Sequence, residues 1–127
     1  MSAGGTSSPA AILVTGDLMF ASRVTAAGQR TGVPVAIALG IDALGEQLAE
    51  GAPKLVVLDL TTPRLDVSTV VERLRAAQGA VPTVIAFGPH VQEQMLAQAT
   101  AAGCDRVLAR GQFNAQMDDL LRRYAGG

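Results

Sequence analysis

Five short apolar runs alternate with five segments of helical periodicity along the 127 residues. The runs are nearly continuous in Val, Leu, Ile and Ala, which is typical of strands buried on both faces of a parallel sheet. The runs are 11–14, 34–39, 54–60, 82–87 and 105–109, and the helical segments are 18–30, 41–50, 67–77, 91–102 and 112–124. Because parallel strands are joined by right-handed crossovers, this alternation predicts a doubly wound α/β domain.

The predicted architecture is a flavodoxin-like (βα)5 three-layer sandwich with strand order 2-1-3-4-5. The first helical segment has Met19, Phe20, Val24 and Ala27 at the spacing of one helix face, so we expect these side chains in the core. Gly103 stands where a C-cap glycine belongs, after the fourth helical segment. Ligands of such sheets bind at the carboxyl ends of the strands, so the residues that follow each run are the candidates for a functional site.

Composition narrows the function classes. Hydrophobic residues make up 49% and aromatic residues 3%, so the chain can build a core, and that core is mainly aliphatic. The net charge of −1 lacks the basic excess that binding to nucleic acid or an anionic membrane requires. Cys104 is the single cysteine and His90 the single histidine, which excludes an internal disulfide framework and a Cys/His metal cluster.

The first nine residues, MSAGGTSSP, are rich in Gly, Ser and Thr. They lack the basic start and apolar run of a signal peptide, and no apolar stretch in the sequence approaches the ~20 residues that cross a bilayer. We therefore expect a flexible leader over 1–9, one domain over 10–127 and a cytoplasmic location.

Two carboxylates follow strands that the predicted order makes neighbours. Asp17 comes after the first run and Asp59 ends the third, so both side chains could reach one acidic pocket suited to a hard cation such as Mg²⁺. Each has a plainer interpretation as well. Asp17 is a good N-cap for the following helix. Asp59 could be a hydrogen-bonded strand end, although an acid inside LVVLDL is costly to bury without a partner.

Three fragments carry a family resemblance: ILVTGD (12–17), LVVLDLTTP (55–63) and AGCDRVLARGQF (102–113). With them, the span 11–124 resembles the receiver domain of bacterial two-component response regulators, the CheY-like superfamily. The resemblance implies that Asp59 takes the position of the aspartate phosphorylated by a histidine kinase. It also implies that Gly16 and Asp17 take the positions of two acids that help hold Mg²⁺, together with Asp59 and the backbone carbonyl of Thr61.

Other positions depart from the family pattern. Phe87 and Gly88 stand where a Ser or Thr normally contacts the phosphoryl group, Arg110 replaces the strand-five lysine, and Gly111 replaces a proline. With one carboxylate fewer, the charge that attracts Mg²⁺ is lower, so we expect no cofactor or a weakly bound Mg²⁺. Arg110 keeps a positive charge but differs from lysine in shape, and we expect it to pair with Asp59 or Asp17.

Two single residues have weaker claims to chemistry. His90 follows the fourth run and could reach the rim of the pocket, but a loop or helix-start residue is the simpler interpretation. Cys104 precedes the fifth run, where a small residue packs well, so a core role is favoured over a nucleophile.

The sequence thus predicts a non-enzymatic pseudo-receiver that works by protein–protein interaction without conventional phosphorylation. A histidine kinase is one candidate partner, and a homodimer could form through the fourth helix, fifth strand and fifth helix, where Gln92, Gln94, Gln98 and Gln116 give a polar, weakly charged surface. One alternative is a single-domain response regulator phosphorylated at Asp59 with Mg²⁺. Another is an unrelated flavodoxin-like domain that binds a small ligand.

Overall fold

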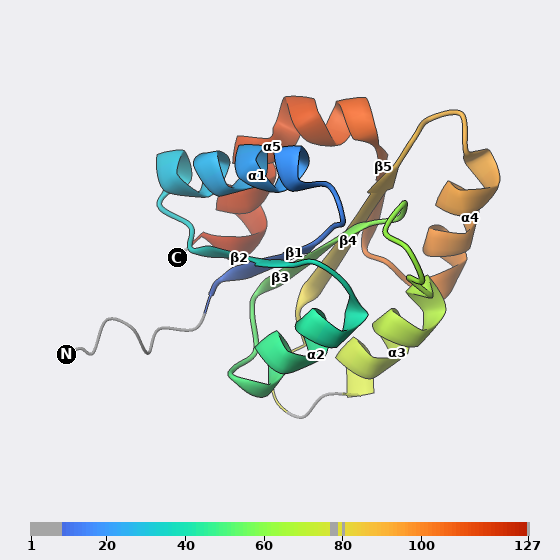
Figure 1. The fold of residues 1–127 in the computed structure, drawn as a ribbon. Coiled ribbons are helices and arrows are strands. Elements are labelled where there is room, and N and C mark those ends of the chain that lie inside the picture. The colour runs from blue at the N-terminus through green and yellow to red at the C-terminus, as the bar shows by residue number, and fades with distance from the viewer. Residues whose placement is uncertain (1–8, 77–78, 80, 127) are drawn as a thin grey trace.

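Five parallel strands and five helices alternate along the chain (Figure 1). The computed structural model describes residues 9–76, 79 and 81–126. The elements are β1 (Ala11–Val14), α1 (Leu18–Thr31), β2 (Val35–Ala38), α2 (Ile41–Ala49), β3 (Leu55–Asp59), α3 (Val67–Ala76), β4 (Thr83–Gly88), α4 (Glu93–Ala102), β5 (Arg106–Ala109) and α5 (Arg110–Ala125). The strand order is β2-β1-β3-β4-β5, which confirms the predicted three-layer topology.

Two helical layers cover the sheet. Helices α1 and α5 lie together on one face, and α2, α3 and α4 cover the other (Figure 1). Strand β1 pairs with β2 on one side and with β3 on the other. The loops that follow these strands therefore meet at the carboxyl-terminal end of the sheet, where the two candidate carboxylates lie.

The two faces of the sheet have different cores. Every aromatic side chain of the protein lies on the α1/α5 side, as Phe20, Phe87, Phe113 and Tyr124, whereas the core under α2, α3 and α4 is aliphatic. The phenylalanine rings form a cluster, with centroids 4.8 Å apart for Phe20 and Phe87 and 4.7 Å apart for Phe87 and Phe113.

Local sequence signals explain several helix ends. The Asp17 side chain accepts hydrogen bonds from the backbone N–H groups of Met19 and Phe20, so it is the N-cap of α1. Gly103 caps α4 with φ of +100°, a left-handed conformation that glycine adopts without strain, as predicted.

Three expectations about the elements were wrong. Met19 is 77% exposed, because its position on α1 points away from the face that buries Phe20 and Val24. Helix α4 begins at Glu93 rather than 91. Helix α5 begins at Arg110, directly after β5, rather than at Gln112. The side-chain carbonyl of Gln112 accepts a hydrogen bond from the Ala109 N–H, which satisfies a backbone donor at the start of α5.

The predicted leader falls mostly outside the described residues, as does the last residue of the predicted helix 67–77. Within the part of the chain that the structure describes, none of the helices is both long and apolar enough to span a membrane.

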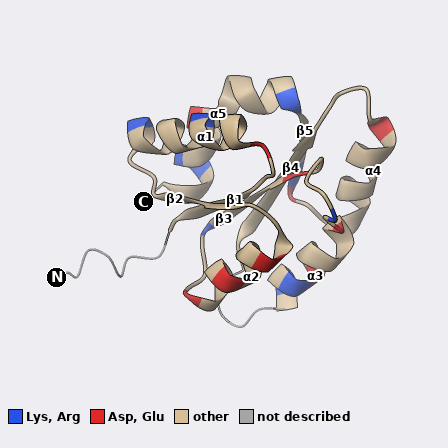
Figure 2. Ribbon diagram, in the orientation of Figure 1, with Lys and Arg blue, Asp and Glu red and all other residues tan. Residues whose placement is uncertain are grey.

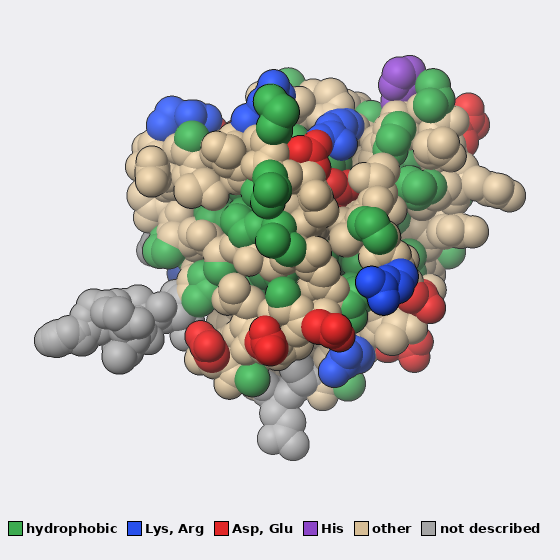
Figure 3. Space-filling view, viewed as in Figure 1, with side chains coloured by type: hydrophobic (Ala, Val, Ile, Leu, Met, Phe, Trp, Pro, Cys, Tyr) green, Lys and Arg blue, Asp and Glu red, His purple; other side chains and the backbone are tan. Residues whose placement is uncertain are grey.

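Side-chain chemistry also varies over the surface. Helix α1 carries arginines and α2 carries acidic residues (Figure 2). Three large hydrophobic side chains are exposed in the loops and first helical turn after β1 and β2, namely Leu18 (68%), Met19 (77%) and Leu39 (56%). Figure 3 shows hydrophobic side chains gathered in the middle of the visible face, beside charged ones.

Candidate functional site

Asp59 is the centre of the candidate site. It is the last residue of β3, pairs in register with Phe87 of β4 and is only 1% exposed. A carboxylate buried to this extent is stable only when hydrogen-bond donors replace the water it has lost.

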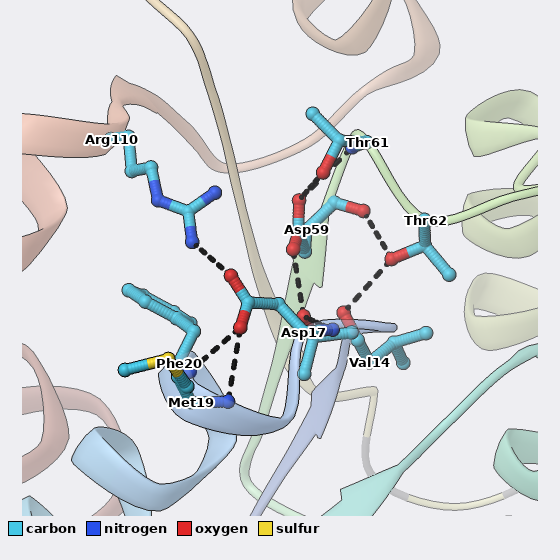
Figure 4. Close-up of polar contacts among 9 residues, drawn as sticks. Val14, Asp17, Met19, Phe20, Asp59, Thr61, Thr62 and Arg110 are labelled. Carbon is cyan, nitrogen blue, oxygen red and sulfur yellow. Dashed lines mark hydrogen bonds and ion pairs between the residues drawn. The ribbon is translucent and has the colours of Figure 1, made fainter.

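Thr15 and Thr61 supply those donors. Figure 4 shows Thr61 beside the Asp59 carboxylate. Thr15 Oγ1 donates to Asp59 Oδ2 at 2.7 Å. Thr61 donates twice to Asp59 Oδ1, from its backbone N at 3.0 Å and from Oγ1 at 2.7 Å. Both carboxylate oxygens of Asp59 therefore accept hydrogen bonds from within the protein.

Thr15 also connects the two candidate acids. Its hydroxyl oxygen accepts a hydrogen bond from the Asp17 backbone N at 3.1 Å while donating to Asp59. The sequence interpretation overlooked Thr15. Its signal is a hydroxyl residue directly after the apolar run of β1, at the edge where β1 and β3 end together, and its side chain is fully buried.

Asp17 is divided between two structural roles. Oδ1 caps α1 by accepting from Met19 N at 3.0 Å and Phe20 N at 3.1 Å. Oδ2 pairs with the Arg110 guanidinium at 2.8 Å. The hydrogen bond from the Phe20 N–H, followed by the interactions with Arg110, holds the pKa of Asp17 below its ordinary value, against a partial opposing effect of desolvation.

Arg110 is held from two sides. As the first residue of α5 it reaches back toward the β1–α1 connection, where it forms the ion pair with Asp17. Its guanidinium carbon also lies 4.7 Å from the ring centroid of Phe20 and 5.9 Å from that of Phe87. Cation–π contact and ion pairing together orient the side chain toward Asp17. Of the two partners that the sequence left open for Arg110, the structure shows Asp17.

The end of β4 presents a ring and a glycine rather than a hydroxyl. Phe87 is fully buried in the aromatic cluster on the α1/α5 side, and its carbonyl accepts a hydrogen bond from Leu60 N at 2.9 Å. Gly88 lies on the opposite side, where an added Cβ would come within 3.3 Å of Met95 Sδ. A side chain at position 88 would have to share this space with α4.

The remaining predicted residues lie outside this network. Gly16 is exposed and lines a cavity of about 520 Å³ together with Leu39 and Pro63. His90 is exposed between β4 and α4. Cys104 is half-buried against the aliphatic core, and desolvation, followed by the charge of Asp105, raises its pKa to about 11. A thiol with so high a pKa is a poor nucleophile at neutral pH, which agrees with a packing role.

No protein-family model matches the sequence, and neither does any curated protein. Solved structures do match. A response-regulator signal receiver domain from Bermanella marisrubri superimposes with a TM-score of 0.76 at 25% identity, covering 90% of this chain and 95% of its own. The chain has the CheY-like receiver fold.

Other receiver domains superimpose equally well at lower identity. The receiver domain of NtrX from Brucella abortus has a TM-score of 0.76 at 17% identity and covers 91% of this chain and 97% of its own. The receiver domain of a Pseudomonas aeruginosa sensor histidine kinase, described with a magnesium ion in its active-site cleft, has a TM-score of 0.75 at 22% identity and covers 95% of this chain and all (100%) of its own.

The receiver fold implies a Mg²⁺ site at these strand ends, and the side chains present do not fit one. Mg²⁺ requires carboxylate oxygens that are free to coordinate. Here the oxygens of Asp17 cap α1 and pair with Arg110, those of Asp59 accept from Thr15 and Thr61, and Gly16 contributes no side chain. Among the described residues, no group of three or more Asp, Glu, His or Cys side chains could hold a metal ion.

Proposed function

We propose that this receiver domain is a pseudo-receiver, a regulatory module that acts by binding other proteins without phosphorylation of Asp59. The observation that carries the proposal is the hydrogen bonding of Asp59. Its two carboxylate oxygens accept three hydrogen bonds, from Thr15 Oγ1 and from the N–H and Oγ1 of Thr61, and the residue is 1% exposed. An attacking carboxylate oxygen needs a clear approach to phosphorus and a partner for the charge that develops on the phosphoryl oxygens.

The surrounding residues support the same proposal. Arg110, at the position of the family's lysine, forms an ion pair with Asp17. Phe87, at the position of the hydroxyl, is buried among other rings and has no polar atom to offer a phosphoryl group. Asp17, at the position of the metal-binding acid, is neutralised by Arg110 and fixed as an N-cap. Two substitutions, Phe87 and Arg110, together with the engagement of the retained Asp17, therefore leave a pocket whose charged groups are paired with one another.

The proposed module is not an enzyme and needs no cofactor. It transmits information through its surface, with a signalling protein as partner. The surface of α4, β5 and α5 is one candidate for such contacts or for a homodimer, since Gln92, Gln94 and Gln98 are exposed and carry no charge. A cytoplasmic location is in keeping with this role.

The alternative is a conventional response regulator. Asp59 is retained at the end of β3, and a receiver domain of the same fold is described with magnesium in its cleft. In that case Asp17, Asp59 and the Thr61 carbonyl would hold a weakly bound Mg²⁺, and the Thr61 hydroxyl would have to release Asp59 Oδ1.

Beryllofluoride with Mg²⁺ separates the two functions. The protein is incubated with 10-fold or greater excess of both and followed by ¹⁹F NMR and by amide spectra, with Asp59→Asn as the control. We expect no adduct and identical amide spectra for the protein with and without the reagent. A bound-fluoride signal that disappears in Asp59→Asn would overturn the pseudo-receiver.

A gain-of-function variant makes a negative result informative. Gly16→Asp combined with Arg110→Lys restores the second acid and the lysine. At position 16 an added Cβ comes within 3.4 Å of Pro63 Cδ, which is ordinary van der Waals contact. We expect Mg²⁺ to shift the amide signals near Asp17 in this variant and to leave them unchanged in the natural sequence. Mg²⁺-induced shifts of equal size in both proteins would contradict the proposal.

A further inference from the structure

The mouth of the degenerate site carries a second feature that phosphorylation chemistry does not use. Leu18, Met19 and Leu39 are 56–77% exposed, and they surround the carboxyl ends of β1 and β2. These three residues, with the cavity-lining Ile41 and Pro63, are called the strand-end patch below. Exposed apolar side chains that gather in one place, rather than singly, mark interaction sites.

The strand-end patch is hollow rather than flat. A cavity of about 520 Å³ is lined by Gly16, Leu39, Gly40, Ile41, Asp42, Ala43, Pro63 and Arg64. A second cavity, of about 200 Å³, is lined by Asp17, Met19, Phe20, Arg23 and Arg110. Gly16 and Asp17 are consecutive, so the two cavities flank one short loop. The absence of a side chain at Gly16 keeps the larger cavity open toward that loop.

The unpaired charges around the strand-end patch are mainly positive. Arg23 lies on the α1 side and Arg64 on the opposite side, and neither side chain has a hydrogen bond or ion pair with any residue in the described part of the chain. The site acids offer little to oppose them, because Asp17 is paired with Arg110 and Asp59 is buried. Asp42 is the acid that remains on the cavity rim.

We propose that the strand-end patch binds a peptide segment of a partner protein that presents a large apolar side chain flanked by carboxylates. The apolar side chain enters the cavity of about 520 Å³, and the carboxylates pair with Arg64 on its rim and with Arg23 beside the smaller cavity. Interfaces of this kind place an apolar anchor in a desolvated pocket and use arginine and methionine more than lysine. The proposal rests on the proposed function, since it names the surface through which the pseudo-receiver makes contact.

Two other occupants fit less well. A two-fold contact between copies would place the same patch on both sides, so four unpaired arginines would gather at one interface. An anionic lipid surface would meet a protein of net charge −1 with its apolar groups around a hollow rather than on a protrusion. Both occupants are outcomes of the experiment below.

The experiment selects peptides without assuming a sequence. An array of random immobilised heptapeptides is probed with the full chain, and the bound peptides are resynthesised with a fluorophore for anisotropy measurements. We expect enrichment of sequences with Leu, Ile, Met or Phe next to Asp or Glu. We also expect affinity to weaken at high salt, because exposed charges are screened.

Matched variants assign the binding to the patch. Met19→Ser and Leu39→Ser remove apolar contacts, and Arg23→Glu and Arg64→Glu reverse the charges. Loss of an anchor contact typically costs about tenfold or more in affinity. Val81→Ser and Arg122→Glu are the controls, since Val81 is also exposed (47%) but precedes β4, and Arg122 lies in the last turn of α5, both at the other edge of the sheet. The controls should bind as the natural sequence does.

Several results overturn the proposal. These are an array without an acidic–apolar consensus, control variants that bind as weakly as the patch variants, and binding to anionic vesicles that the patch variants abolish. A concentration-dependent dimer in sedimentation velocity that Leu39→Ser dissociates would assign the patch to a second copy and overturn the peptide. Because no phosphodonor is present, failure here leaves the beryllofluoride result for Asp59 standing, and the reverse also holds.

Discussion

The two faces of the sheet are covered by cores built from different types of side chain. Under α1 and α5 the core contains Phe20, Phe87, Phe113 and Tyr124, whereas under α2, α3 and α4 it is built from Val, Leu, Ile and Ala. Phe87 and Arg110 of the candidate site belong to the aromatic side. Because the buried rings of Phe20 and Phe87 contact the Arg110 guanidinium, a change in ring packing also changes the surroundings of this charge. Among the described residues, the aliphatic core on the other face contains no rings that could make such a contact.

The contrast explains why the altered site is stable. Arg110 is supported by Phe20 below and Asp17 beside it, so a charge that would otherwise need a ligand is satisfied within the fold. Phe87 packs against Phe20 and Phe113 with ring centroids 4.8 and 4.7 Å apart. The site and the core of the α1/α5 layer are therefore one unit.

The largest expected effect comes from truncating one large side chain on each face. Phe87→Ala should lower the free energy of unfolding by about 3–5 kcal/mol and Leu74→Ala by about 2–5 kcal/mol, because both side chains are fully buried. Only Phe87→Ala should also move the NMR signals of Asp17, since it removes a ring beside Arg110. Urea denaturation and carboxyl-detected NMR measure both. Equal shifts of Asp17 in the two variants would show that the faces are not separately coupled.

Next in size is the reactivity of the thiol on the aliphatic side. Burial raises the pKa of Cys104 from an ordinary 9.0 to about 11, which leaves about a hundredth of the usual thiolate at pH 8. Alkylation by iodoacetamide should be slow in the native state and should accelerate as pH rises toward 11. Unfolding in urea restores the rate of an ordinary thiol. Native and unfolded rates that agree at pH 8 would place Cys104 outside the core.

A smaller effect is expected between the faces, at the threonine that connects the acids. Thr15→Val keeps the shape of the side chain but removes the donor to Asp59 Oδ2, so the free energy of unfolding should fall by about 1–3 kcal/mol. Thr25→Val is the control, because its half-buried hydroxyl bonds only the Ala21 carbonyl within α1. Thermal and urea denaturation compare the two. A cost for Thr25→Val as large as that for Thr15→Val would mean that the bond to Asp59 adds nothing.

The smallest effect concerns the exposed end of the aromatic side. The pKa of Asp17 is lowered in the folded state, so its charged form contributes stability above the unfolded pKa of about 4, and that contribution is lost as pH falls through the lower folded pKa. Asp17→Asn keeps a good N-cap and removes the titration. Unfolding measured from pH 2 to 5 should therefore depend less steeply on pH in the variant. The same slope in both proteins would contradict a lowered pKa of Asp17, and with it the combined effect of the Phe20 N–H hydrogen bond and the Arg110 ion pair.

The sequence predicted the fold more fully than the site. Continuous apolar runs and their alternation with helical periodicity were enough to predict a parallel sheet covered on both faces. The strand order came from the flavodoxin-like pattern and the resemblance to receiver domains, and the structure confirms it. Asp59 and Asp17 were found because acids at strand ends stand out against apolar neighbours. The exposure of Met19 was missed, since helical spacing alone does not say where an apolar face ends.

The contacts between side chains at the site could not be predicted from the sequence and became known only from the structure. The sequence left Arg110 between two acids, and the choice of Asp17 depends on α5 beginning directly after β5. Thr15 was overlooked because a hydroxyl after a strand is common in turns, and its bond to Asp59 links residues 44 positions apart. Such long-range hydrogen bonds leave no periodic pattern in a sequence.

The one-sided distribution of rings also determines what spectroscopy can report. The chain contains no tryptophan and a single tyrosine, and Tyr124 packs against the α1/α5 core. Near-ultraviolet circular dichroism, tyrosine fluorescence and ring-current shifts of methyl signals therefore originate in that layer. The α2/α3/α4 layer is optically silent, so loosening of this half would go undetected by these probes and would need a tryptophan introduced there to be seen.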